Sequence, residues 1–203
     1  EDCLSQRVSS ASIHCTENHH EVEQAHEAGL SVGRYRLLLE LQKQDPNITA
    51  DDIAGLSMGG YGALKVGLTH PEQYGTIASF SGAVDLGKMF QSMGDSLDPK
   101  CLAEYQGIFG TEMQLLPEDD ILHLTREHAR LPKEQQCRFF ISCGTEDNIP
   151  TLYESNVEYV KLLKELGLDC IWFEQKGIHE WGVWDEAVRE ALNRFDGERI
   201  YYV

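Results

Sequence analysis

Residues Asp52 to Leu64 read DIAGLSMGGYGAL, and this stretch decides what the rest of the chain can be. A short apolar run leads into the pentapeptide GLSMG, and a helical pattern rich in Gly and Ala follows it. A GxSxG sequence between a strand and a helix puts its serine on a tight, strained turn whose neighbours must lack bulk. Ser57 is therefore the candidate nucleophile, although an ordinary capping serine at a strand-to-helix turn is the alternative that the pentapeptide alone allows.

The composition predicts one globular domain over residues 1–203. Of the 203 residues, 41% are hydrophobic and 25% are charged, which suffices for a sizeable core. With 34 acidic against 17 basic side chains the formal charge is −17, so neither nucleic acid nor an anionic membrane is expected as a partner. The chain lacks a long apolar run and a signal-peptide pattern, which predicts a cytoplasmic protein. It opens on Glu1, as a fragment or a processed product would, and nothing in it indicates an oligomeric state.

The first 34 residues show no sustained strand or helix period, so we expect them to lack regular structure. Within them, His19, Glu23 and His26 or Glu27 would share one face of a helix, which is a spacing that metal ligands use. A solvated polar segment accounts for the same residues, including His20. We therefore predict no metal site.

The cysteines are scattered and show no CxxC spacing. Some of them lie in apolar, strand-like runs such as FFISCG and DCIWFE, which predicts buried free thiols. Disulfides are the alternative that an even count permits. The six positions are Cys3, Cys15, Cys101, Cys137, Cys143 and Cys170.

Strand-like and helix-like segments alternate along the chain. Continuous apolar runs predict parallel strands covered on both faces, and helical periods between them predict the covering helices. The succession predicts an α/β fold with a mostly parallel, doubly wound sheet and helices on both faces. The predicted strands are DIAGL, TIASFSGAV, CRFFISCG and LDCIWFEQ, and the predicted helices are YRLLLELQKQ, GYGALKVGLTHPEQY, residues 151–166 and WDEAVREALNRF.

Residues 85–131 interrupt this alternation and contain one weakly helical segment, EDDILHLTREHAR. An excursion of this length is uncommon in a compact domain unless it has a function, so we interpret it as a cap over the site. A structural insertion is the alternative interpretation.

An acid and a histidine each follow a predicted strand. Asp147 comes shortly after RFFISCG, and His179 shortly after CIWFEQ. The carboxyl ends of parallel strands share one edge of a sheet, so both side chains are expected near Ser57. The order of serine, acid and histidine is the one found in α/β-hydrolases. Glu146 competes with Asp147 as the acid, and we prefer Asp147; Asp185, on the last predicted helix, is expected to be solvated.

Three separated motifs, GLSMGGYGALKVGLTHPEQY, CGTED and GIHEWGVWDEAV, resemble the esterase D family of α/β-hydrolases. That family includes tributyrin esterases, S-formylglutathione hydrolases, feruloyl and acetylxylan esterases and mycolyltransferases, and the likeness is greatest to bacterial tributyrin-type esterases. It runs from Tyr35 to Phe195. The resemblance implies an α/β-hydrolase fold in which Ser57 is the nucleophile, Asp147 the acid and His179 the base. Residues 1–34 do not resemble the family's opening strands, which implies a truncated, out-of-frame or diverged start.

These residues together predict a serine carboxylesterase that cleaves short acyl esters through an acyl-enzyme and needs no cofactor. The N–H of Met58 would stabilise the oxyanion. The resemblance places a second donor in a loop before the elbow, and we find no such loop in the sequence. Trp181, beside the histidine, would contact the substrate, with a packing role as the alternative. The alternatives in function are acyl transfer on the same triad and a non-catalytic hydrolase-fold protein with an incomplete oxyanion hole.

Overall fold

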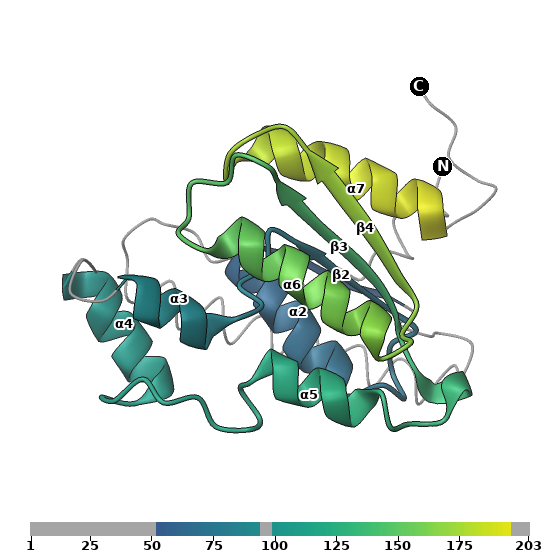
Figure 1. Ribbon diagram of the computed structural model, residues 1–203, viewed down its shortest axis with the longest axis horizontal. Helices are drawn as coiled ribbons and strands as arrows, with labels where there is room; N and C mark the ends of the chain where they lie inside the picture. Colours follow the sequence, from purple (N-terminus) through teal and green to yellow (C-terminus); the bar gives the residue numbers. More distant parts are fainter. Residues whose placement is uncertain (1–51, 94–98, 196–203) are drawn as a thin grey trace, which may run out of the picture.

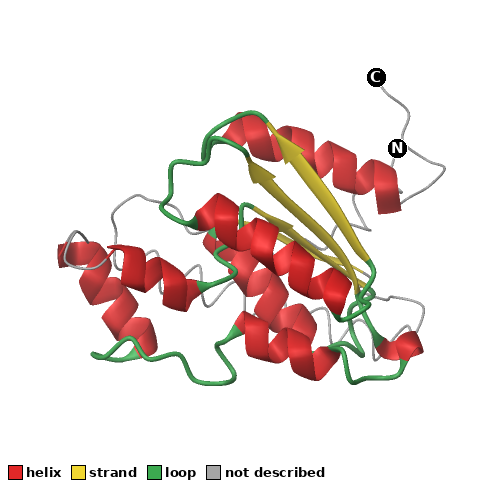
Figure 2. Ribbon diagram, viewed as in Figure 1, coloured by secondary structure: helices red, strands yellow, loops and turns green. Residues whose placement is uncertain are grey.

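The computed structural model describes residues 52–93 and 99–195, which form a parallel sheet with helices on both faces (Figures 1 and 2). The four strands lie side by side in chain order, and each neighbouring pair is parallel. This confirms the predicted α/β fold and its four strands. The predicted helix YRLLLELQKQ and the histidines near the N-terminus lie outside the described residues. The strands are β1 (Asp52–Leu56), β2 (Thr76–Phe80), β3 (Arg138–Gly144) and β4 (Cys170–Gln175).

The helices cover the two faces of the sheet unequally. α2, α5 and α6 lie on one face, and α7 lies on the other (Figure 1). α3 and α4 extend beyond the N-terminal end of α6. None of the helices in the described residues is long and apolar enough to span a membrane. The helices are α2 (Met58–Thr69), α3 (Leu86–Met93), α4 (Pro99–Phe109), α5 (Ile121–His128), α6 (Leu152–Glu165) and α7 (Trp181–Phe195), with a 3-10 helix at Lys133–Gln135.

Alternation along the strands divides the core between the two faces. Side chains at successive strand positions point to opposite faces, so Ile77 and Phe139 pack with α2 and α6 whereas Phe80 and Phe140 pack with α7. β2 is buried over its whole length, and β3 at every residue but Arg138, as expected for central strands with helices on both sides. The buried centre of the sheet therefore supports the loops at its carboxyl edge.

The last part of the excursion belongs to the helical layer. In α5, Thr125 is fully buried, and its Oγ1 lies 2.9 Å from the hydroxyl of Tyr159 on α6. Just before α5, the Tyr61 hydroxyl of α2 donates to the carbonyl of Asp119 at 2.9 Å. α5 therefore packs in one layer with α2 and α6. The cap over the site predicted for residues 85–131 stays a prediction.

Three of the cysteines in the described part of the chain carry free thiols. Cys137 and Cys143 are buried, Cys170 is half-buried, and none of the three forms a disulfide. Burial raises the pKa of Cys137 to about 11 and that of both Cys143 and Cys170 to about 12. Free thiols are thereby confirmed for these three positions. Cys3 and Cys15 lie outside the described residues.

His128, at the end of α5, is held in the core as a neutral imidazole. It is 2% exposed, and its Nε2 accepts the backbone N–H of Cys137 at 2.9 Å. Its ring meets the Phe139 ring edge-on, with centroids 5.8 Å apart. Desolvation lowers the pKa of His128, because protonation would place a charge in this apolar surrounding.

We expect the stability of the fold to decline on acidification because of His128. The unfolded chain gains a proton on this residue near the ordinary pKa of about 6.5, whereas the folded chain resists it, so stability is lost as the pH falls through the lower folded pKa. Urea unfolding between about pH 8 and pH 5 measures this effect, and His128→Gln should show a flatter pH dependence than the unmodified protein. Parallel curves for the two proteins would contradict the assignment.

Candidate active site

Ser57 lies on a strained turn between β1 and α2. Its φ of 53° and ψ of −122° are unfavourable for a residue with a Cβ, and its backbone N–H is tied to the carbonyl of Phe80 at 2.8 Å. A Cβ on Gly55 would lie 2.0 Å from the carbonyl oxygen of Gly59, so the chain can close this turn only with glycine there. The strained turn predicted from GxSxG is confirmed.

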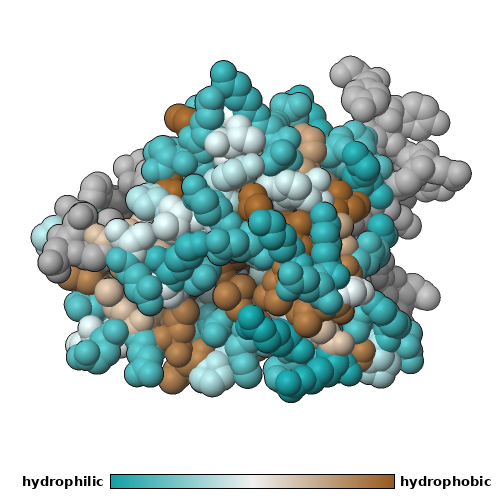
Figure 3. Space-filling view, viewed as in Figure 1, coloured by the Kyte–Doolittle hydropathy of each residue, from teal (hydrophilic) through white to brown (hydrophobic). Residues whose placement is uncertain are grey.

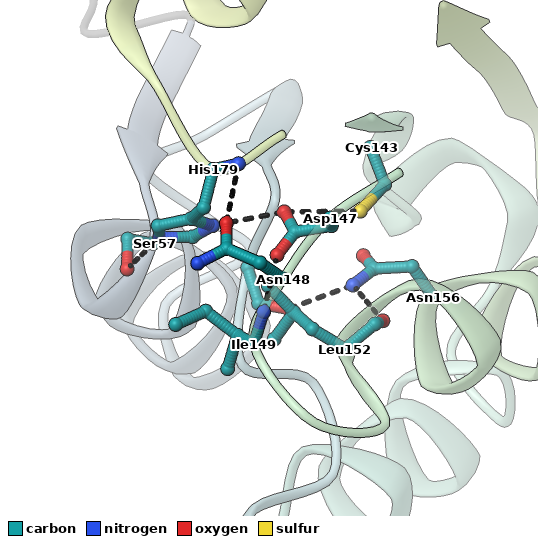
Figure 4. Close-up of polar contacts among 9 residues, drawn as sticks. Ser57, Cys143, Asp147, Asn148, Ile149, Leu152, Asn156 and His179 are labelled. Carbon is teal, nitrogen blue, oxygen red and sulfur yellow. Dashed lines mark hydrogen bonds and ion pairs between the residues drawn. The ribbon is translucent and has the colours of Figure 1, made fainter. Parts of the chain in front are cut away.

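The structure brings the three predicted site residues into one line of hydrogen bonds (Figure 4). The Nε2 of His179 lies 2.8 Å from the Oγ of Ser57, and its Nδ1 lies 2.9 Å from Oδ2 of Asp147. The carboxylate is fully buried and the imidazole side chain is 14% exposed. The three residues follow β1, β3 and β4, so the shared carboxyl edge of the sheet accounts for their meeting.

The carboxylate of Asp147 is fixed from three sides. Its Oδ1 accepts the N–H of Ile149 at 3.0 Å, which leaves Oδ2 for the imidazole. The buried thiol of Cys143 lies 3.8 Å from Oδ2 as a weak donor. Burial raises the pKa of Cys143, and the negative charge of Asp147 raises it further. By contrast, the side chain of Glu146 is 54% exposed and lies 3.6 Å from the Lys176 ammonium. The geometry therefore favours Asp147 over Glu146 as the orienting acid, and Asp185 is exposed as expected.

Two tryptophans lie in the first turn of α7, and one of them contacts His179. Trp184 is 8% exposed and meets the imidazole edge-on, with ring centroids 4.9 Å apart. Trp181 is 57% exposed, and its ring meets that of Trp184 edge-on with centroids 5.4 Å apart. Sequence reasoning singled out Trp181 because it is closer in the chain and considered packing the alternative role of both tryptophans. It did not predict that Trp184 packs against the imidazole of His179. The contact of Trp181 with substrate stays a prediction.

A positively polarised N–H lies beside the nucleophile. Met58 is the first residue of α2, so its N–H has no acceptor within the helix and lies at the positive end of the helix dipole. This arrangement suits the stabilisation of an oxyanion next to Ser57. The expected position of a second donor, before the elbow, lies outside the described residues.

Metal chemistry has no visible support in residues 52–93 and 99–195, where no three His, Cys, Asp or Glu side chains gather closely enough to hold an ion. The candidate ligands His19, Glu23, His26 and Glu27 lie outside this part of the chain. We assign no metal role to any described residue.

Apolar side chains lie open in the region of α3 and α4. Ile108 is 65% exposed and Leu116 is 54% exposed, and hydrophobic residues gather over this part of the face seen in Figure 3. A hollow of about 600 Å³ is lined by α3 and the segment after α4, from Gly87, Phe90, Gln91, Glu112, Met113, Gln114 and Leu115.

The family whose description is "Putative esterase" matches residues 38–195 of the sequence. The chain belongs to this esterase family. The match spans the elbow, the acid and the histidine, and it confirms the resemblance to esterases that the three sequence motifs indicate.

A curated relative and two solved structures are similar to this family member. The acetyl esterase of Caldicellulosiruptor saccharolyticus is 29% identical over 146 residues, which are 69% of this chain and 52% of the relative. The apoenzyme of the Staphylococcus aureus S-formylglutathione hydrolase FrmB shares 22% identity at a TM-score of 0.58, over 77% of this chain and 61% of that one. The fluorophosphonate-binding serine hydrolase FphF from the same organism shares 21% identity at a TM-score of 0.57, over 79% and 62%.

These comparisons differ in what they show. The likeness to the two solved structures confirms the α/β-hydrolase fold and carries no information about substrate. The chain spans about half the length of the curated relative that it matches. Activity and substrate are therefore matters of proposal.

Proposed function

We propose that this protein is a serine carboxylesterase that hydrolyses short-chain acyl esters through an acyl-enzyme. The observation that carries the proposal is the continuous hydrogen-bonded line from the Ser57 hydroxyl through the imidazole of His179 to the buried carboxylate of Asp147. A serine next to a base that is oriented by an acid is the arrangement that nucleophilic acyl transfer requires.

In the proposed first step, Ser57 Oγ forms a bond to the ester carbonyl carbon while its proton passes to Nε2 of His179. The imidazolium that results is stabilised by Asp147, whose burial keeps water from competing for its charge. The tetrahedral intermediate then breaks its bond to the alcohol oxygen, which takes the proton from Nε2. Water then adds to the carbonyl carbon of the acyl-enzyme while Nε2 of His179 accepts its proton. The bond to Ser57 Oγ breaks, Oγ takes the proton back from Nε2, and the carboxylic acid is released.

The strain at Ser57 contributes to this chemistry by positioning. Because the turn projects the hydroxyl away from the sheet and places Met58 N–H beside it, the negative carbonyl oxygen of the intermediate would meet a prearranged donor. Preference for a short acyl group is supported by the acetyl esterase among the relatives of this chain.

The proposal predicts rapid hydrolysis of p-nitrophenyl acetate or butyrate and much slower hydrolysis of p-nitrophenyl palmitate. Ser57→Ala should lower kcat by at least about a thousandfold because no nucleophile remains. A spectrophotometric assay of both proteins checks these outcomes. A folded wild-type protein with no activity above the Ser57→Ala background would instead favour a non-catalytic hydrolase-fold protein.

A further inference from the structure

Asn148 makes a contact with the candidate base that the triad does not account for. It follows Asp147 in the loop between β3 and α6, and its side-chain Oδ1 accepts the backbone N–H of His179 at 3.1 Å (Figure 4). The two partners are 31 residues apart in the chain. One loop therefore holds His179 at two points, through the ring by Asp147 and through the backbone by Asn148.

His179 needs a second contact because its position in the loop leaves its backbone without regular secondary structure. It sits in an irregular segment between β4 and α7, so no helix or strand ladder fixes its backbone. Its ring must nevertheless keep one nitrogen 2.8 Å from Ser57 and the other 2.9 Å from Asp147. A displacement of about 1 Å at such a base can cost a large part of the rate.

The two loops are already joined closer to the sheet. Thr145 N–H donates to the carbonyl of Gln175 at 2.8 Å, and Glu146 N–H donates to that of Gly177 at 3.0 Å. The backbones approach so closely that a Cβ on Gly144 would lie 2.4 Å from the carbonyl oxygen of Gly177. The second of these backbone hydrogen bonds is at Gly177, two residues before the base. The Asn148 side chain extends the attachment to His179 itself.

We propose that Asn148 is a positioning residue that anchors the backbone of His179, so that the imidazole spans Ser57 and Asp147. The inference rests on the proposed function, because it gives Asn148 a role in the same proton transfer. It assigns to Asn148 no contact with substrate. Loss of the acceptor should therefore affect turnover and leave substrate binding unchanged.

The test compares two variants at Asn148 with a matched control in the same loop. Asn148→Ala removes the acceptor and should lower kcat for p-nitrophenyl acetate about threefold to tenfold, the range of one side-chain hydrogen bond, with KM unchanged. Asn148→Asp keeps an acceptor at the same place and should retain kcat near about pH 8. Thr145→Ala, at an exposed side chain, should retain kcat throughout.

Fluorophosphonate labelling and urea unfolding separate the outcomes. Asn148→Ala should label at Ser57 more slowly than the wild type and should unfold at the same urea concentration. Equal kcat and equal labelling rates for Asn148→Ala and wild type would overturn the role of Asn148 while the proposed function stands. An Asn148→Asp variant as slow as Asn148→Ala at every pH would also overturn it. A wild-type protein that neither labels nor hydrolyses esters would overturn the proposed function and this inference together.

Discussion

Replacing Asp147 by Asn is expected to lower kcat by about a thousandfold to ten-thousandfold, whereas Glu146→Gln should change it by less than about twofold. The carboxylate of Asp147 is fully buried, and its Oδ2 meets the imidazole Nδ1 at 2.9 Å. An amide at this place cannot stabilise the imidazolium and offers its own N–H toward Nδ1, which turns the imidazole to the wrong tautomer. Glu146 is exposed near Lys176 and touches neither the base nor the nucleophile in any contact described above.

Steady-state kinetics with p-nitrophenyl acetate on both variants measures this difference. Because Asn and Gln each replace one carboxylate oxygen by an amide nitrogen, the two changes are matched in size and in charge. Urea unfolding of Asp147→Asn shows whether the loss is one of chemistry. An Asp147→Asn variant that keeps more than about a tenth of the wild-type kcat would contradict the assignment of the acid.

Replacing Gly55 by Ala is expected to destabilise the fold by about 3 kcal/mol or more and to abolish the elbow. The added Cβ would lie 2.0 Å from the carbonyl oxygen of Gly59 and 2.3 Å from its carbonyl carbon, and neither backbone atom can move without shifting the start of α2. Because Ser57 lies between these two glycines, any such shift also moves the nucleophile.

Gly107→Ala is the matched control for this prediction. Gly107 lies inside α4, and a Cβ there would meet no atom within 4 Å. Replacing a glycine inside a helix by alanine should stabilise the protein by up to about 1 kcal/mol. Urea denaturation followed by tryptophan fluorescence compares the two variants. Equal unfolding midpoints for Gly55→Ala and Gly107→Ala would show that the elbow tolerates a side chain, against the geometry described above.

Sequence patterns predicted the parts of this fold that have strong local signals. Runs such as TIASF and RFFISCG are mostly apolar because their strands are covered on both faces, and this pattern favours buried parallel strands. The shared edge of a parallel sheet then allowed Ser57, Asp147 and His179 to be placed together from their strand ends alone. The catalytic roles of these residues stay proposals.

Features that depend on packing between distant segments could not be predicted from the sequence. The sequence of α5 is weakly helical, and its contacts with Tyr159 and Phe139 show that it belongs to the core. Asn148 has no distinguishing pattern, because a polar residue in a loop is the commonest kind. Trp184 resembles any helix residue that faces a core until the structure places it against His179.

The claim that Ser57 and His179 form a nucleophile and its base is tested most directly by labelling the intact protein with a fluorophosphonate and locating the adduct by mass spectrometry. We expect one adduct, on Ser57, that forms far more slowly in His179→Ala than in the wild type. An adduct on another residue, or an equal rate of labelling at Ser57 in His179→Ala, would contradict it.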